Sequence, residues 1–276
     1  MVYLTVEQHQ EVVRRLLALA RNRANKIPFH PEGMEYHSLM VCFLLHNLSV
    51  AETLLRLSDS FGKEWFPVTV GYAITRTMFE TDVTAHYISN AAAERARQYI
   101  DFSAVLNKRQ MDACLKHRNS KEPSWREAMS MLWQNHWEPR QLEISKKFDV
   151  VASQFTRTTK NGKQAVFQNW SGKKLRDMAI EVNHVEAYDI FYAELSSFAH
   201  VDVHLADRFL QHRLDGPVWS QRADEFDIGN VFRHAASFLT CYLEMFGRQF
   251  KTWPETEVEN CWQMPSSNGT DFRHFV

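Results

Sequence analysis

The stretch EYHSLMVCFLLHNLSVAETLLRLSD, residues 35–59, decides the fold class. Its apolar residues recur every three or four positions, which is the period of a helix with one apolar face. This spacing places on a single stripe Met40, Leu44, Leu48, Ala51 and Leu55. Neither glycine nor proline interrupts the stretch, so nothing in it would end a helix. We therefore predict one long, mostly buried helix here.

The same helical period continues on both sides of this stretch. Upstream, Thr5 and Gln8 have the spacing of a capping box and predict a helix that runs to about Asn25. Downstream, we expect helices over about 65–89, 91–119, from 123 onward, 172–182, 185–199, 202–214 and 227–250. Residues 153–169 differ, because Asn161 and Gly162 favour a type I′ hairpin turn. The predicted fold class is all-α: a single domain over residues 1–276, a bundle of about eight helices, with a β-hairpin or irregular arm near 153–169.

Composition bears on the partners and the cellular location expected of such a bundle. The 32 basic and 33 acidic residues nearly cancel, so no overall charge would draw the chain to nucleic acid or to an anionic membrane. The four cysteines have no CxxC spacing, and the first residues lack the order of a signal peptide, so we predict reduced thiols and a cytoplasmic location. The longest apolar run, Val41 to Leu48, is too short to cross a bilayer, and we predict no membrane partner.

Two polar patterns lie on helices that are otherwise apolar. Arg76 and Glu80 are four residues apart and share a helix face, where they could form a buried salt bridge that fixes helix register. Alternatively, Glu80 could hold the Arg76 guanidinium ready for a phosphate or carboxylate. The spacing alone leaves both interpretations open.

The second pattern is a row at four-residue spacing: Tyr188, Tyr192, Ser196 and His200. All four would share one helix face, where a core helix would be apolar. One interpretation is a set of buried hydrogen bonds at a helix crossing. The other makes His200 a general acid or base, oriented by Ser196 or Ser197.

These segments together resemble a known family. Arg76-Thr-Met-Phe-Glu80, His86-Tyr87-Ile88, the helix start at Trp170-Ser-Gly, and the tyrosine, serine and histidine row are similar to the bacterial family of unknown function called DUF5677. The resemblance covers about residues 40–210. It implies an all-helical fold and a role in stress or phage defence, and it implies no established activity.

Two classes of function fit these patterns. As an enzyme, the chain would be a metal-independent ribonuclease-like effector of the HEPN type, with catalytic residues Arg76, Glu80, Tyr192, Ser197 and His200. His200 would deprotonate a ribose hydroxyl while Arg76 stabilised the charge on the phosphate. The sequence nevertheless lacks the single helix that carries both the arginine and the histidine in HEPN ribonucleases, because Pro28 interrupts Arg23-x6-His30, the one match to that spacing.

The alternative is a non-enzymatic binding or regulatory protein with a polar pocket for a small anionic ligand. Its ligand-binding residues would be Tyr188, Ser196, Lys173, Lys174 and Arg176, the last three belonging to the basic residues around the arm. The expected partners are therefore RNA or a small anionic ligand, with a homodimer as a further expectation. The choice between enzyme and binding protein stays open at this stage.

The sequence predicts neither a metal nor an organic cofactor. A dimetal bundle needs two Glu-x-x-His motifs, and only Glu181 to His184 has that spacing. His200 and His204 could reach one metal ion, but a third ligand would have to come from elsewhere, with Glu80 or His86 as the nearest choices. Glycine-rich phosphate loops are absent from the sequence.

Overall fold

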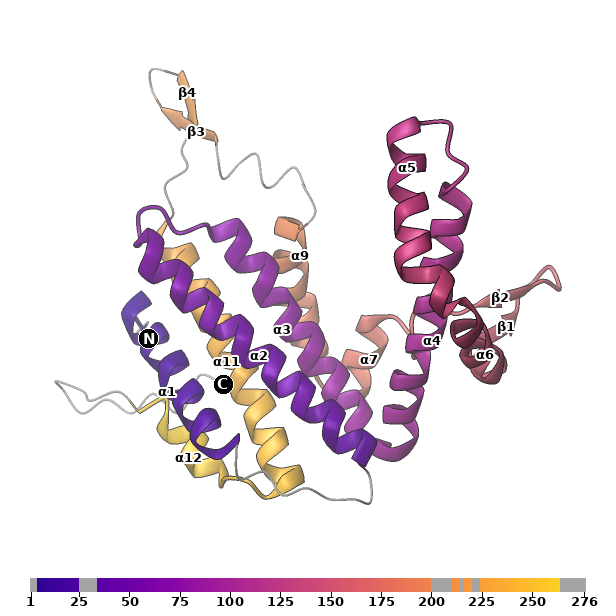
Figure 1. The fold of residues 1–276 in the computed structure, drawn as a ribbon. Helices are drawn as coiled ribbons and strands as arrows, with labels where there is room; N and C mark the ends of the chain where they lie inside the picture. Colours follow the sequence, from indigo (N-terminus) through magenta and orange to yellow (C-terminus); the bar gives the residue numbers. More distant parts are fainter. Residues whose placement is uncertain (1–3, 25–33, 200–209, 214–215, 220–223, 264–276) are drawn as a thin grey trace. The chain divides into compact units, whose positions relative to one another are not determined.

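A computed structural model describes residues 4–24, 34–199, 210–213, 216–219 and 224–263. The prediction of a mostly helical fold with a small hairpin arm is confirmed (Figure 1). Contacts divide the chain into two compact units. Unit 1 comprises Met1–Asn90 and Leu175–Val276, and unit 2 is Ala91–Lys174. Each is described by itself below, and the single domain over residues 1–276 stays a prediction.

Unit 1 is built around the long helix α11 (Glu225–Phe250). Asp224 caps this helix, because its carboxylate accepts the Phe226 N–H at 2.8 Å. Most of α11 is buried, as expected of a helix that packs on several sides. It contacts α1 (Val6–Ala24), α2 (Met34–Phe61), α3 (Val68–Ser89) and α12 (Glu255–Asn260), with the first three running alongside it in Figure 1. The core of unit 1 lies among these helices.

The first two helices follow the sequence pattern closely. Thr5 N–H donates to Gln8 Oε1 at 2.8 Å and Gln8 N–H donates to Thr5 Oγ1 at 3.3 Å, so the predicted capping box is confirmed. In α2 the five residues of the predicted apolar stripe are all buried. The prediction of one long helix over residues 35–59 is therefore confirmed, but the helix is not mostly buried, because 11 of the 28 residues of α2 are buried.

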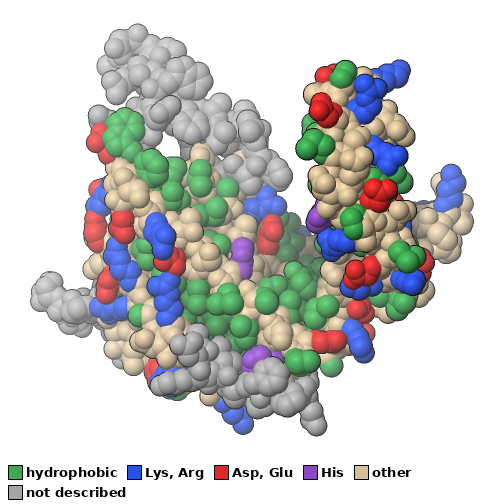
Figure 2. Space-filling model, in the orientation of Figure 1, with side chains coloured by type: hydrophobic (Ala, Val, Ile, Leu, Met, Phe, Trp, Pro, Cys, Tyr) green, Lys and Arg blue, Asp and Glu red, His purple; other side chains and the backbone are tan. Residues whose placement is uncertain are grey.

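Helix α2 is also long and apolar enough to span a membrane by length and composition, which the short run at residues 41–48 did not indicate. Half of that apolar window is buried inside unit 1, as in the core helix of a globular protein. Figure 2 shows hydrophobic side chains gathered over the face formed by α2 and α3. Leu45 on α2 and Val70 on α3 are exposed. Core packing accounts for the buried half of the window, and the absence of a membrane partner stays a prediction.

A broken helical segment packs against α3. It consists of α7 (Leu175–Glu181), α8 (Val185–Ala187), the π-helical turn η4 (Tyr188–Tyr192) and α9 (Ala193–Ala199). Helix α7 ends in a Schellman motif: Asn183 is left-handed with φ of 59°, and the His184 N–H donates to the Ala179 carbonyl at 2.8 Å. Both α7 and α9 contact α3. The segment therefore brings His184 and Tyr192 into contact with side chains of that helix.

Unit 2 has a small core of its own. Its elements are α4 (Ala92–His117), α5 (Pro123–Leu132), the π-helical η1 (Trp133–Trp137), η2 (Glu138–Arg140), α6 (Gln141–Val151), η3 (Ala152–Phe155), β1 (Thr156–Thr158) and β2 (Gln164–Val166). The buried cluster consists of Met111, Cys114, Trp133, Trp137 and Ile144. It joins α4, η1 and α6, so this unit has an apolar interior independent of α11.

The arm in unit 2 is a hairpin, but its turn differs from the prediction. Strand β1 pairs antiparallel with β2, and the Gly162 N–H donates to the Thr159 carbonyl at 2.9 Å. Gly162 has φ of 72°, whereas Asn161 is not among the residues with positive φ, as a type I′ turn would require. The predicted type I′ turn is therefore wrong. The Thr159 N–H donates to the Lys163 carbonyl at 2.7 Å, so the loop between these paired residues is 160–162, where the glycine alone takes the left-handed conformation.

The helix predicted over residues 202–214 is wrong for its last residues, 210–213, which form a strand. Residues 200–209 lie outside the described residues, but β3 (Leu210–Arg213) pairs antiparallel with β4 (Gly216–Trp219). Gly216 and Pro217 disfavour continuation of a helix, and the strand that they begin is the hydrogen-bonding partner of β3.

Candidate functional site

Three of the predicted site residues meet between α3 and η4. The Arg76 Nε donates to Glu80 Oε1 at 2.8 Å, and Arg76 Nη2 donates to the Tyr192 hydroxyl at 2.8 Å. The Tyr192 hydroxyl in turn donates to the same Glu80 oxygen at 3.0 Å. Arg76, Glu80 and Tyr192 therefore form a closed triangle, which we call the Arg76 cluster.

Aromatic rings enclose one side of the Arg76 cluster. Tyr188 and Tyr192 are stacked, with ring centroids 4.7 Å apart, and the ring of Phe79 lies 5.6 Å from that of Tyr192. The Arg76 guanidinium carbon is 5.0 Å from the Tyr192 ring centroid, a distance at which cation and ring attract. Tyr188, predicted as a ligand-binding residue, thus supports the ring of Tyr192.

Burial and charge shift the pKa values in this cluster. Burial raises the pKa of Tyr192, and so do the charge of Glu80 and the hydrogen bond to it. Burial acts to lower the pKa of Arg76, but the Glu80 carboxylate outweighs it and the net shift is upward. Tyr192 and Arg76 therefore keep their protons at neutral pH, and both act as hydrogen-bond donors.

The remaining predicted residues are distributed differently. The buried Ser196 hydroxyl lies near Tyr192, whose pKa it acts to lower, but it makes no hydrogen bond of normal geometry within the described chain. The Ser197 hydroxyl donates to the Glu194 carbonyl at 2.7 Å and is thereby used inside its own helix. Arg176 makes two hydrogen bonds to Asp189, at 2.9 and 2.8 Å.

The other predicted contributors cannot be joined to the Arg76 cluster. Lys173 and Lys174 belong to unit 2, and their place at the same site stays a prediction. His200 lies outside the described residues, and so does His204. The general acid or base of the enzymatic hypothesis is therefore not among the residues that the structure describes.

A second polar cluster, the Asp82 cluster, lies further along α3 and was not predicted. It consists of Asp82, His86 and His184, and one ligand atom of each lies within 4.8 Å of the others. His86 Nδ1 is 3.2 Å from Asp82 Oδ1, and His184 Nδ1 is 3.3 Å from Asp82 Oδ2. The Asp82 side chain is 2% exposed, against 17% and 22% for the two histidines. The carboxylate is therefore the buried part of the cluster, and the two imidazoles are the parts closer to solvent.

The pKa values of the Asp82 cluster favour an ion pair. Burial acts to raise the pKa of Asp82, but the charges and hydrogen bonds of both histidines outweigh it, so the net shift is downward. Burial acts to lower the pKa of His86, yet the Asp82 carboxylate raises it overall. Asp82 is accordingly charged at neutral pH despite its burial.

Sequence reasoning missed this cluster because its parts are far apart in the chain. Asp82 and His86 have the four-residue spacing of a shared helix face, but His184 follows nearly a hundred residues later. The available signal was Asn183, a residue that often ends a helix in the left-handed conformation and so fixes the direction of the next side chain. The sequence pattern suggests His86 only as a further ligand beside His200 and His204.

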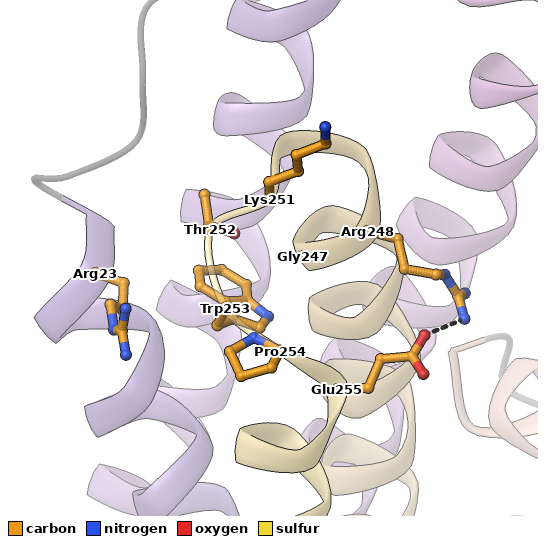
Figure 3. Close-up of a pocket in the computed structure, with 8 residues that line it drawn as sticks. All are labelled: Arg23, Gly247, Arg248, Lys251, Thr252, Trp253, Pro254 and Glu255. Carbon is orange, nitrogen blue, oxygen red and sulfur yellow. Dashed lines mark hydrogen bonds and ion pairs between the residues drawn. The ribbon is translucent and has the colours of Figure 1, made fainter.

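A pocket of about 470 Å³ lies at the C-terminal end of α11 (Figure 3). Arg23, Arg248, Lys251 and Glu255 line it together with Trp253. Its arginines are already engaged, because Arg248 donates to Glu255 at 2.9 Å and Arg23 donates to Glu257 at 2.7 Å. These pairs largely neutralise the charged lining, which indicates no particular class of ligand.

Comparison with known proteins places the chain in a family without giving an activity. No curated protein and no solved structure matches it. The model of the DUF5677 family, described as a family of unknown function, matches residues 37–217, which include every described residue of both clusters. Because this match covers more than half of the sequence, the chain belongs to the DUF5677 family.

Proposed function

We propose that this chain is a binding protein for a small anionic ligand, which Arg76 and Tyr192 receive through a carboxylate or phosphate group. The observation that carries the proposal is the position of Glu80 Oε1, which accepts hydrogen bonds from both residues. Glu80 then acts as an internal occupant of the place where a ligand oxygen would bind. The guanidinium and the phenol donate in the manner of sites that recognise anions.

Exchange of Glu80 for a ligand would cost little. Glu80 is 39% exposed and Arg76 is 20% exposed, so the carboxylate can turn into water while the arginine stays in place. An ion pair of this four-residue type contributes only about 0.3–0.5 kcal/mol at a helix surface. The hydrogen bonds that Arg76 and Tyr192 donate to Glu80 would be replaced by equivalent bonds to the charged oxygens of the ligand, so both donors stay satisfied.

The raised pKa values of Tyr192 and Arg76 support binding over proton transfer at this cluster. Neither group would give up a proton near neutral pH, as an acid–base catalyst must. The ribonuclease hypothesis depends on His200 instead. Incubation of the wild-type chain with labelled RNA tests it, since cleavage that is lost in His200→Ala would contradict a purely binding function.

Calorimetric titration with inorganic phosphate tests the binding proposal. Glu80→Gln removes the internal competitor and is expected to tighten phosphate binding about tenfold, the equivalent of 1.4 kcal/mol. Arg76→Gln is expected to abolish binding. Arg56 forms a comparable four-residue pair with Glu52 on α2, so Arg56→Gln is the matched control and should bind as the wild type does. Equal phosphate affinity in all four proteins would contradict the proposal.

A further inference from the structure

We propose that the Asp82 cluster is a binding site for a divalent transition-metal ion of the zinc class. Its ligands would be the Asp82 carboxylate and one ring nitrogen from each of His86 and His184. This inference is independent of the anion site, because it rests on other residues and a different ligand. Imidazole and carboxylate are ligands that such ions take in proteins.

The spacing of the ligand atoms fits a tetrahedral ion. Bonds of about 2.0–2.1 Å to nitrogen and oxygen place neighbouring ligands of a tetrahedral zinc ion about 3.3–3.4 Å apart. His86 Nδ1 is 3.2 Å from Asp82 Oδ1 and His184 Nδ1 is 3.3 Å from Asp82 Oδ2, while one ligand atom of each residue lies within 4.8 Å of the others. To bind the ion, His86 would either release the hydrogen bond of its Nδ1 to the Asp82 backbone carbonyl or use its Nε2.

The hydrogen bonding of one Asp82 oxygen gives a second indication of a cation site. Asp82 Oδ1 is buried, and its 3.2 Å contact with His86 Nδ1 lacks good hydrogen-bond geometry within the described chain, because His86 Nδ1 is also 3.0 Å from the Asp82 backbone carbonyl. A buried carboxylate oxygen that lacks a well-formed hydrogen bond is costly, and native structures usually satisfy it. A bound cation would satisfy it.

The surrounding elements would hold these ligands at fixed positions. Asp82 and His86 are one helical turn apart on α3, and His184 follows the left-handed Asn183 that ends α7. The histidines are partly exposed, which leaves a route for the ion to enter. Three protein ligands leave the fourth position of a tetrahedral ion to water or to a ligand, as in zinc sites of open coordination.

The test is a titration of the full chain, stripped with a chelator, with cobalt(II) and then with zinc. We expect one equivalent of cobalt to produce the visible absorbance of tetrahedral coordination, and zinc to displace it. His184→Gln removes a ligand that lies outside α3, and Asp82→Asn removes the buried charge without changing the shape of the side chain. Each is expected to weaken zinc binding at least about tenfold.

His46→Gln is the matched control. His46 lies on α2 and belongs to neither cluster, and its Nε2 is 3.2 Å from the Thr77 hydroxyl. It should bind zinc as the wild type does. Circular dichroism separates loss of binding from loss of folding; should Asp82→Asn unfold, His184→Gln alone decides. A wild-type chain that binds less than half an equivalent of zinc, or a folded His184→Gln variant with unchanged affinity, would overturn the proposal.

Discussion

At the scale of single residues, the buried histidines His9 and His234 make the stability of the folded chain depend on pH. Both are more than nine-tenths buried, and His9 Nδ1 and His234 Nε2 make no hydrogen bond with any described residue. Burial, aided by the positive charge of Arg233, lowers the pKa of His9 to about 4 and that of His234 to about 3. Each ring is therefore neutral in the folded chain well below the pH at which the unfolded chain protonates it.

Stability should consequently fall on acidification. Between pH 6.5 and pH 4 the unfolded chain binds more protons at these positions than the folded chain does, so this contribution is complete above pH 6.5 and is lost as the pH falls. At pH 5 the loss amounts to about 2 kcal/mol for each histidine. Urea unfolding at pH 7 and pH 5 measures it. His234→Gln should reduce the loss by about 2 kcal/mol, whereas the exposed His46→Gln should leave it unchanged.

At this scale the sequence predicted part of the candidate site. The spacing of Arg76 and Glu80 and the position of Tyr192 indicated polar groups on helix faces, and these three residues do meet. The partner of Asp82 could not be predicted, because a four-residue spacing fixes only neighbours on one helix. Which distant histidine approaches Asp82 depends on the packing of α7 and α8 against α3.

At the scale of single elements, α11 contains two glycines with opposite roles. A Cβ atom at Gly247 would lie 2.6 Å from Trp253 Nε1 and 3.0 Å from the Trp253 carbonyl oxygen, whereas at Gly229 the nearest atom would be 3.8 Å away. Trp253 is held by its hydrogen bond to the Leu243 carbonyl and cannot move aside easily. The close contact of helix and tryptophan therefore requires glycine at 247 and not at 229.

The two alanine variants should change the free energy of unfolding in opposite directions. Gly247→Ala is expected to lower the free energy of unfolding by about 1–3 kcal/mol, because the new methyl group overpacks a fixed contact. Gly229→Ala is expected to raise it by about 0.5–1 kcal/mol, since alanine favours a helix interior. Denaturant unfolding of both variants beside the wild type measures the difference. Equal effects would show that the Trp253 contact does not limit this position.

Elements were predicted well where the helical period is unbroken and less well where it changes. The capping box at Thr5 and the stripe of α2 followed from spacing alone. The π-helical turn at residues 188–192 did not, because one additional residue in a turn leaves no mark in an apolar pattern. The turn at Gly162 was predicted as a hairpin of the wrong type, since Asn-Gly also suits the longer loop in which only glycine is left-handed.

For the whole molecule, the division into two units predicts how it unfolds. The small core of unit 2 shares no residue with the apolar interior around α11. We expect scanning calorimetry to resolve two transitions. Zinc at a hundred times its Kd should stabilise only the unit that contains Asp82, by about 2.7 kcal/mol. A single transition, or a shift of both transitions by zinc, would contradict this prediction.

The position of unit 2 within the chain also sets the order in which the Asp82 cluster assembles during synthesis. Asp82 and His86 leave the ribosome before all of unit 2, and His184 leaves after it. At about 5–20 residues per second, the nearly hundred intervening residues take on the order of 5–20 seconds. During that time the Asp82 carboxylate, which is almost fully buried in the folded chain, has His86 beside it but not yet His184. The new chain therefore passes through a stage in which unit 2 can fold while the cluster in unit 1 is still open.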